Sequence, residues 1–428
     1  MIKPLRIAIV GAGPAGLAAA LYLKRSEHQV TVFERFAEAS PVGSGLILQP
    51  TGLSVLENLG LFEAIAQLGS RIDRLYGADA QSGRTVLDVR YAAIKGGRYG
   101  IAVHRAALFH VLFQAAQAEG IRVETGLDVD TLDTRGDQAW LVGNGQAKAG
   151  PFDLVVDASG SRSKLKMLAL QPSEPKPLVY GAFWASLQAD QAALSSQALV
   201  QRYHRATTMI GVLPIGKAGP GSADMSAFFW STKPDQVEAL KRAGINSWKD
   251  HVAGLWPDCE SYLQQINDFD DMTLARYGHH TLAMPVGRSL AIIGDAAHST
   301  SPQLGQGANM ALLDARALMH ALNTSTDLAS ALPRYAASRR LHVRTFQALS
   351  GAFTPFYQSD SRVLPFLRDR VMATLSKIPP APQILAAMVA GTLVDPFGPI
   401  GLKERHWGVC LPEEADHLQQ SGFPPARE

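Results

Sequence analysis

Cysteine is scarce in this chain and charge is nearly balanced, and both features exclude classes of protein. The only cysteines among the 428 residues are Cys259 and Cys410, and neither lies in a metal-binding spacing such as Cys-x-x-Cys. A disulfide framework and a cysteine-ligated zinc site are therefore excluded, and we expect no metal ion. The formal net charge is only +2. A balance this close to neutral does not indicate a nucleic acid partner.

Long hydrophobic runs are also missing. The longest apolar stretch, Ile384–Val394, is far shorter than the roughly 20 residues that a membrane-spanning helix needs. A glycine turn interrupts the apolar N-terminal run, so this run does not have the pattern of a signal peptide. We therefore expect a cytoplasmic protein for which membrane association is unlikely. The chain length predicts two or three structural units.

The N-terminal stretch has the pattern of a dinucleotide-binding βαβ unit. An apolar strand, Ile7–Val10, leads directly into the glycine-rich turn Gly11–Gly16, and a helical run follows. The next strand, Val30–Phe33, ends at Glu34. A glycine turn alone is weak support for a nucleotide site, but here strand, turn, helix, strand and acid occur in the expected order.

The three glycines of this turn each have a physical role. Gly11 permits a tight turn, Gly13 lets a pyrophosphate approach the backbone, and Gly16 lets the helix pack closely against the strand. A carboxylate at Glu34 can accept hydrogen bonds from both hydroxyls of a ribose. The sequence therefore predicts a bound dinucleotide.

The rest of the chain predicts an α/β fold in which a second unit is inserted. Alternating patterns between residues 172 and 274 indicate antiparallel strands, whereas a buried strand followed by a helix returns near residue 290. The expected division is a nucleotide-binding domain at 1–171 and 275–345, an inserted domain at 172–274 that strands within 72–97 join, and a helical C-terminal region at 346–428.

Two glycine-containing stretches are interpreted as turns. Within Ile72–Val89 we expect turns at Gly77 and at Ser82–Gly83. The stretch Gly216–Gly221 could suggest a second nucleotide site, but no helix follows it, so a hairpin tip is the favoured interpretation.

Three motifs together resemble one enzyme family. They are GAGPAG at 11–16, DLVVDASGSRS at 153–163 and GDAAHSTSPQLGQGAN at 294–309. In this order and at these separations, they resemble the para-hydroxybenzoate hydroxylase-like (group A) FAD-dependent aromatic monooxygenases. The resemblance implies a Rossmann-like FAD-binding domain, an inserted antiparallel β-sheet substrate domain and a helical C-terminal tail. It also implies that FAD is the cofactor.

The resemblance implies an activity as well. In this family NADPH or NADH reduces the flavin transiently, O2 adds to it, and a C4a-hydroperoxide hydroxylates a small aromatic or heteroaromatic, phenol-like molecule. The alternative is a flavin dehydrogenase or reductase on the same scaffold without oxygen insertion. That alternative is motivated by Ser159, which stands where the family usually has an acid. Oligomeric state and the identity of the substrate are not indicated.

The resemblance further implies a set of FAD-binding residues. Those expected at the pyrophosphate and at the adenosine end are Gly11, Gly13, Ala15, Gly16, Glu34, Arg35 and Val129. Those expected along the ribityl chain and at the isoalloxazine are Gly45, Arg105, Asp295, Pro302, Gly305, Gly307, Ala308 and Asn309. Gly305, Gly307, Ala308 and Asn309 lie at the start of an expected helix, where backbone N–H groups stabilise the negative charge of a reduced flavin.

Catalytic side chains are not identified by this pattern. The weak candidates for a base are His204 and His280, and a structural role is the commoner outcome for each. Strand alternation predicts that Arg202 and His204 share one face. We expect His298 to hold the turn before Pro302.

The tail from Phe353 to Ile384 is apolar and carries Arg362, Arg368, Arg370 and Lys377. Packing of this segment over the mouth of the active site is favoured over contact with a membrane surface.

Overall fold

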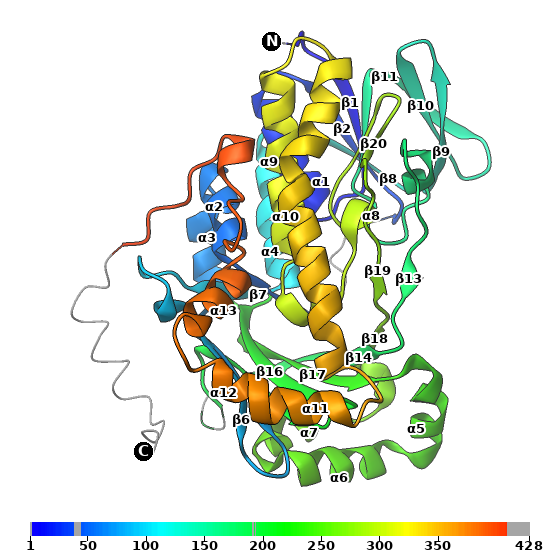
Figure 1. The fold of residues 1–428 in the computed structure, drawn as a ribbon. Coiled ribbons are helices and arrows are strands. Elements are labelled where there is room, and N and C mark those ends of the chain that lie inside the picture. Colours follow the sequence, from blue (N-terminus) through cyan, green and yellow to red (C-terminus); the bar gives the residue numbers. More distant parts are fainter. Residues whose placement is uncertain (1, 38–43, 191, 193, 409–428) are drawn as a thin grey trace.

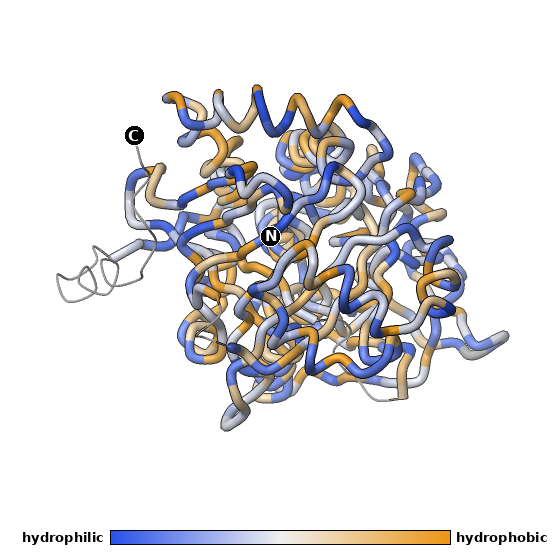
Figure 2. The backbone as a smooth tube through the Cα atoms, turned by 90° about the horizontal axis from the view of Figure 1, so that it is seen from below, coloured by the Kyte–Doolittle hydropathy of each residue, from blue (hydrophilic) through white to orange (hydrophobic). Residues whose placement is uncertain are grey.

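The computed structural model describes residues 2–37, 44–190, 192 and 194–408, so Cys410 lies outside the described residues. It is a mixed α/β structure in which helices cover several sheets (Figure 1). Apolar and polar residues are interleaved along the chain (Figure 2). Within the described ranges, no helix is both long enough and apolar enough to cross a membrane.

The N-terminal strand lies inside a six-stranded sheet with the order β20-β21-β12-β1-β2-β8. Only the edge strand β20 is antiparallel to its neighbour. The strands are β1 (Arg6–Val10), β2 (Gln29–Glu34), β8 (Arg122–Thr125), β12 (Leu154–Asp157), β20 (Val286–Gly287) and β21 (Leu290–Ile292). Because the parallel strands run in one direction, their carboxyl ends meet at one edge, where ligands bind in such sheets.

Alternate residues of β1 enter two different cores. Ile7 and Ile9 pack with helices on one face, whereas Ala8 and Val10 pack against a small antiparallel sheet on the other. That small sheet contains β9 (Val129–Arg135), β10 (Gln138–Gly143) and β11 (Ala147–Phe152). The helices of this part are α1 (Pro14–Arg25), α2 (Pro50–Asn58), α3 (Phe62–Leu68), α4 (Arg105–Ala118), α8 (Asp295–His298), α9 (Gly307–Asn323) and α10 (Leu328–Tyr357).

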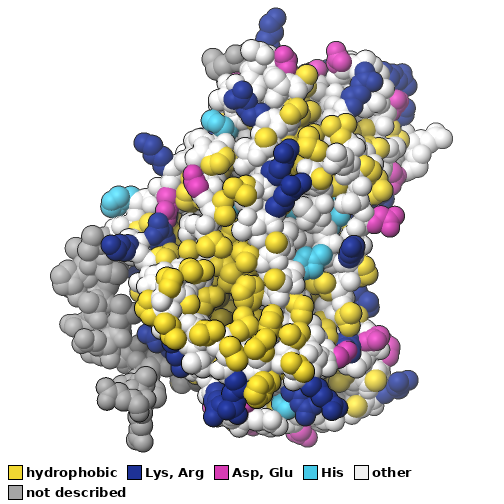
Figure 3. Space-filling view, viewed as in Figure 1, with side chains coloured by type: hydrophobic (Ala, Val, Ile, Leu, Met, Phe, Trp, Pro, Cys, Tyr) yellow, Lys and Arg dark blue, Asp and Glu magenta, His cyan; other side chains and the backbone are white. Residues whose placement is uncertain are grey.

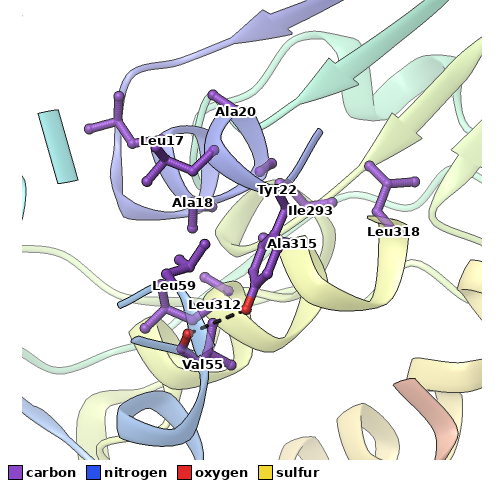
Figure 4. Packing of buried hydrophobic residues seen from close by; sticks show 14 of the residues in the cluster. Leu17, Ala18, Ala20, Tyr22, Val55, Leu59, Ile293, Leu312, Ala315 and Leu318 are labelled. Carbon is purple, nitrogen blue, oxygen red and sulfur yellow. Dashed lines mark hydrogen bonds between the residues drawn. The ribbon is translucent and has the colours of Figure 1, made fainter. Parts of the chain in front are cut away.

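Helix α1 is the centre of the helical layer. It packs against both α9 and α4, and its buried face is rich in alanine, which lets helices approach closely. Figure 4 shows Leu17, Ala18 and Tyr22 among residues of α2 and α9. The Tyr22 hydroxyl lies 3.3 Å from the Val55 carbonyl oxygen of α2. This packing fixes the start of α1 relative to the sheet.

A second large sheet has seven strands in the order β18-β14-β17-β16-β15-β5-β6. Its strands are β5 (Arg74–Asp79), β6 (Thr85–Arg90), β14 (Gly181–Gln188), β15 (Ala198–His204), β16 (Thr208–Lys217), β17 (Asp224–Thr232) and β18 (Thr273–Ala275). One face is covered by α5 (Val237–Ala243), α6 (Ile245–Leu255) and α7 (Glu260–Leu263). The hairpin β5–β6, from the 72–97 stretch, pairs with β15.

The predicted turn at Gly77 is wrong. Gly77 lies inside β5, and the chain reverses only after Asp79. The glycine is needed there because a Cβ atom would lie 2.4 Å from the ring of Tyr203 on the neighbouring strand. Close packing against an aromatic ring, and not backbone reversal, explains this glycine.

Smaller elements join the two large sheets. A three-stranded sheet contains β3 (Gly45–Leu48), β4 (Ser70–Ile72) and β7 (Gly100–His104), and a two-stranded ribbon contains β13 (Lys176–Pro177) and β19 (Gly278–His279). After α10, the tail forms α11 (Val363–Leu367), a π-helical turn at Arg368–Met372, α12 (Ala373–Leu375) and α13 (Ala381–Ala390). In Figure 1 this orange tail lies in front of the seven-stranded sheet.

Candidate cofactor and active site

A cavity of about 610 Å³ opens at the carboxyl ends of β1, β2 and β12. Its lining brings together predicted residues that are far apart in the sequence, namely Gly11, Gly13, Glu34, Arg35, Arg105, Val129 and Asp295. It also includes residues 160–164, most of which belong to the DLVVDASGSRS motif but were not named individually among the expected FAD-binding residues. This stretch follows a buried strand at the same sheet edge, a signal that could have identified it.

The glycine turn has one open position and two crowded ones. Gly11 has φ +106°, and a Cβ atom there would lie 2.6 Å from the Ala158 carbonyl oxygen. At Gly16 a Cβ atom would lie 1.9 Å from the carbonyl oxygen of Gly11, so Gly16 serves packing of the helix on the turn. By contrast, no protein atom lies within 4 Å of a Cβ placed at Gly13. Only Gly13 therefore faces open space where a ligand can approach.

The start of α1 is suited to an anionic group. Gly13 is the N-cap residue, no side chain caps the helix, and its first turn contains no acidic residue. The first backbone N–H groups of a helix have no partner within the helix. They and the helix dipole favour a pyrophosphate at this point.

The Glu34 carboxylate is held at the cavity by backbone groups. It accepts hydrogen bonds from the Ala12 N–H at 2.9 Å and from the Arg35 N–H at 2.9 Å. These bonds fix the carboxylate between the glycine turn and the end of β2. Its remaining lone pairs can accept from ribose hydroxyls.

Asp157 holds the turn that follows β12. Its fully buried carboxylate accepts a hydrogen bond from the Ser159 N–H at 3.0 Å and from the hydroxyls of Ser159 and Ser163. Burial raises the pKa of Asp157, although these hydrogen bonds act in the opposite direction. These contacts are those of a residue that holds a turn. Ser159 lines the cavity.

Asp295 differs from its neighbours because its side chain is exposed at the cavity while Ile293, Gly294, Ala296 and Ala297 are buried. A carboxylate in this position can accept hydrogen bonds from ligand hydroxyls. The start of α9 lies beside it, since a Cβ at Gly307 would be 3.7 Å from Oδ1 of Asp295. Helix α9 also has no side-chain cap. An acceptor and a group of N–H donors therefore lie side by side.

His298 is buried one turn after Asp295. Its Nε2 lies 2.5 Å from Oδ2 of Asp314 in α9, and Asp314 also accepts from Arg339 Nε in α10 at 2.7 Å and from the Gly294 N–H at 2.9 Å. This is the geometry of a residue that holds the turn, which agrees with the role expected for His298.

Several predicted residues lie outside the cavity lining. They are Ala15, Gly16, Gly45, Pro302, Gly305, Ala308 and Asn309, together with Gly307, which reaches the cavity only through its position beside Asp295. A Cβ at Gly45 would lie 2.4 Å from Ile215 of β16, so Gly45 lets two strands pack. Pro302 begins a short 3-10 turn that ends at Leu304.

Asn309 has a structural role that the sequence did not reveal. Its Oδ1 accepts from the Gln49 N–H at 2.8 Å, and its Nδ2 donates to the carbonyls of Ile47 and Gly305. Because both amide protons are used, only the backbone N–H of Asn309 remains to meet a flavin edge. The side chain joins α9 to β3.

The two weak catalytic candidates are placed away from the cavity. Strand alternation puts His204 on the same sheet face as Val200 and Arg202, and α6 covers this face. The Arg202 guanidinium lies over the ring of Trp256. His280 is buried, and its Nε2 lies 2.8 Å from the Ser173 carbonyl oxygen. Burial lowers the pKa of both histidines. Neither position supports a role as a base at the flavin.

Tyr277 lies in the same titratable stretch as His280, but the sequence did not single it out as a candidate. Its hydroxyl accepts a hydrogen bond of 2.7 Å from Trp184 Nε1, on the sheet face opposite to His204. Burial raises its pKa to about 12, although the Trp184 hydrogen bond and the Arg105 charge act in the opposite direction. Tyr277 is therefore a neutral hydroxyl donor near the cavity residue Arg105.

The comparisons with known proteins agree with this geometry. A family model described as an FAD binding domain matches residues 5–349. The chain belongs to this family. The chain is also similar to a 3-amino-4-hydroxybenzoate 2-monooxygenase of Streptomyces cremeus, which is 30% identical over 343 residues that cover 75% of this chain and 79% of that protein. An FAD-dependent urate hydroxylase of Klebsiella pneumoniae is 26% identical over 347 residues, covering 79% and 87%.

A solved structure shares the fold. The crystal structure of Klebsiella pneumoniae HpxO complexed with FAD and uric acid superposes with a TM-score of 0.76 at 22% identity, and the match covers 91% of this chain and 97% of that one. The predictions of FAD as the cofactor and of a monooxygenase are confirmed: the chain is an FAD-dependent monooxygenase. The alternative without oxygen insertion is not favoured.

Proposed function

We propose that this FAD-dependent monooxygenase hydroxylates a small aromatic or heteroaromatic molecule with O2 and NADPH or NADH. The reaction balances as substrate, O2, NAD(P)H and a proton giving hydroxylated substrate, water and NAD(P)+. The observation that carries the proposal is the cavity. It is lined by Gly13, which faces open space, by the Glu34 carboxylate, which can accept from a ribose, and by the exposed Asp295 carboxylate. The two named relatives act on urate and on an aminohydroxybenzoate.

The residues present fit FAD. In this proposal the N-terminus of α1 and Gly13 bind the pyrophosphate, Glu34 binds the adenosine ribose, and Asp295 accepts from the ribityl hydroxyls. Arg35 and Val129 lie at the adenosine end, and Arg105 lies along the phosphate and ribityl chain. When bound, FAD supplies the redox chemistry by accepting a hydride from NAD(P)H and activating O2. The start of α9 stabilises negative charge on the ring edge.

The substrate domain is assigned to residues 172–274 with the β5–β6 hairpin. One face of its seven-stranded sheet presents Trp184, which donates to the hydroxyl of Tyr277 just beyond the domain, while the opposite face packs on α5–α7. Since the Tyr277 oxygen already accepts from Trp184, its own proton can be donated to a ring oxygen or nitrogen of the substrate. Tyr277 is thereby the substrate-positioning residue of this proposal.

Helix α13 covers the loop that would face the flavin. Gln306 Nε2 donates to the Val389 carbonyl, and Met388 packs with Leu304 and Met310. Exclusion of water here would protect the oxygen transfer from release of hydrogen peroxide.

A panel assay tests this function. The purified yellow protein is incubated with NADPH or NADH and with purines, hydroxypyridines or aminohydroxybenzoates, and nucleotide consumption, product and hydrogen peroxide are measured. We expect one compound class to accelerate nucleotide oxidation and to yield a hydroxylated product. Nucleotide oxidation that no compound accelerates, or that yields only hydrogen peroxide, would contradict the proposal.

A further inference from the structure

The tail presents an unusual concentration of exposed apolar side chains. Between residues 363 and 384 the large apolar residues with more than a third of their surface exposed are Val363, Phe366, Leu367, Val371, Leu375, Ile378 and Ile384. We call these residues the tail patch. Figure 3 shows a broad hydrophobic area over this part of the face, at the elements labelled α11 to α13 in Figure 1. Contiguous apolar surfaces of this kind mark interaction sites.

The tail is firmly attached to the protein through its other face. The fully buried Arg368 donates to the carbonyls of Phe356 and Arg205, and its guanidinium lies 4.9 Å from the ring centre of Tyr203. Nearby, Asp360 accepts hydrogen bonds from Tyr180 and Lys233. The inward face of the tail thus packs against the end of α10 and against β15, and the tail patch is left outward.

The exposed charges between residues 361 and 390 all have one sign. Arg362, Arg370 and Lys377 are exposed among the apolar residues. The only acid between residues 361 and 390 is Asp369, which pairs with the buried Arg368 at 2.6 Å. An apolar stripe interleaved with unopposed basic residues has the composition of an interfacial helix that lies on an anionic bilayer.

A second copy of the chain fits this surface poorly. A symmetric contact would bring the same three cations toward their counterparts, and like charges at an interface cost binding energy. An anionic surface instead complements them.

We propose that the tail patch docks this protein peripherally on anionic lipid bilayers. Phe366, Val371 and Leu375 enter the boundary between headgroups and acyl chains, and Arg362, Arg370 and Lys377 contact the anionic headgroups. This revises the expectation that membrane association is unlikely. It concerns attachment by one face, in a protein whose described helices include none that spans a membrane.

The test is sedimentation of the full-length, FAD-loaded protein with lipid vesicles. One set of vesicles contains phosphatidylcholine only and the other contains phosphatidylcholine mixed with phosphatidylglycerol. We expect binding to the anionic set that weakens as NaCl is added, because each basic residue near such a surface strengthens binding roughly fivefold. The triple variant Arg362→Gln, Arg370→Gln, Lys377→Gln should then bind on the order of a hundredfold more weakly.

A second variant tests the apolar part with a matched control. Phe366→Gln with Leu375→Gln should lower binding at least about tenfold, because less apolar area is buried in the lipid. Leu170→Gln removes a leucine of similar exposure, 65%, from outside the tail and should bind as the unaltered protein does. FAD content and hydroxylation of a soluble substrate should be unchanged in all three variants, so this test does not depend on the proposed function.

Three results would overturn the proposal. The first is absence of binding to the anionic vesicles, and the second is binding that the tail variants do not weaken. The third is an unaltered protein that is dimeric and does not bind vesicles, together with a Phe366→Gln, Leu375→Gln variant that is monomeric. The last result would assign the tail patch to contact between two copies.

Discussion

Nε2 of His298 lies 2.5 Å from Oδ2 of Asp314, and both side chains are buried where α8, α9 and α10 meet. Asp314 binds Arg339 through its other oxygen at 2.7 Å. It also binds the backbone N–H of Gly294, the residue that precedes Asp295. A buried ionic network therefore positions the turn that presents the Asp295 carboxylate to the cavity.

This network predicts a pH dependence of stability. Burial alone would lower the pKa of His298, but the neighbouring Asp314 carboxylate outweighs burial and the pKa is raised above 6.5. A group with a raised pKa stabilises the folded state below its unfolded-state pKa, and this contribution is lost as pH rises through the folded-state pKa. The free energy of unfolding should therefore fall as pH rises from 6.5 through the His298 pKa.

Urea denaturation across this pH range checks the expectation. The fall should be reduced in His298→Gln and retained in His251→Gln, which alters an exposed histidine of α6. An equal fall in both variants would show that other groups cause it. At low pH the dependence of stability on pH has the opposite sign. Burial alone would raise the pKa of Asp314, but the neighbouring His298 and Arg339 outweigh burial and lower this pKa to about 2. Its contribution should be lost as pH falls from 3.8 toward 2.

The glycine turn predicts opposite outcomes for two similar substitutions. Gly13→Ala places a methyl group in open space, so the apoprotein should lose less than about 1 kcal/mol of stability. FAD affinity should nevertheless fall at least about tenfold, because the methyl group occupies the approach to the pyrophosphate. Gly16→Ala places a methyl group against the Gly11 carbonyl and should cost about 3 kcal/mol or more.

Thermal unfolding of the apoproteins and FAD titration by fluorescence separate the two effects. A Gly13→Ala protein that binds FAD as tightly as the unaltered chain would show that the pyrophosphate lies elsewhere.

Asp295→Ala should give protein that is poor in flavin. Loss of a charge-assisted hydrogen bond to the ribityl hydroxyls costs about 1.5 to 3 kcal/mol, which corresponds to roughly 10- to 100-fold in affinity. Asp137→Ala, an exposed acid on a distant hairpin, is the matched control and should keep full occupancy. Flavin absorbance per protein after purification measures both. Full yellow occupancy in Asp295→Ala would reject this placement.

Tyr277, through its contact with Trp184, and His204 lie on opposite faces of the seven-stranded sheet and should behave differently. Tyr277→Phe should bind FAD normally, raise KM for the hydroxylated substrate about tenfold and divert more O2 to hydrogen peroxide, because one hydrogen bond to the substrate is lost. His204→Gln should leave kcat and KM unchanged. A reduced kcat in His204→Gln with normal flavin content would restore His204 as a catalytic candidate.

The sequence predicted most of what is local and periodic. The first strand, the glycine turn, α1 and Glu34 form one continuous pattern, and the cavity lies where that pattern indicates. Gly77 was misinterpreted because the sequence alone does not distinguish a glycine that makes room for the Tyr203 ring from a glycine that forms a turn. Long-range packing decided the difference.

The same limit applies to the site. Asn309 lies in a flavin motif, yet its side chain binds Gln49, Ile47 and Gly305, which are spread over most of the chain length. Tyr277 gained significance only through Trp184, a residue 93 positions earlier. Contacts of this kind follow from tertiary structure, so strand alternation alone could not select Tyr277 over His204.

The central claim, that the FAD bound in this cavity transfers oxygen to an aromatic ring, is tested by one labelling measurement. The holoprotein is reduced anaerobically with NADPH or NADH in the presence of the compound that the panel assay selects, and it is then mixed with isotopically labelled O2. The account predicts one labelled oxygen atom per product molecule. A product without labelled oxygen, with all O2 recovered as hydrogen peroxide, would contradict it.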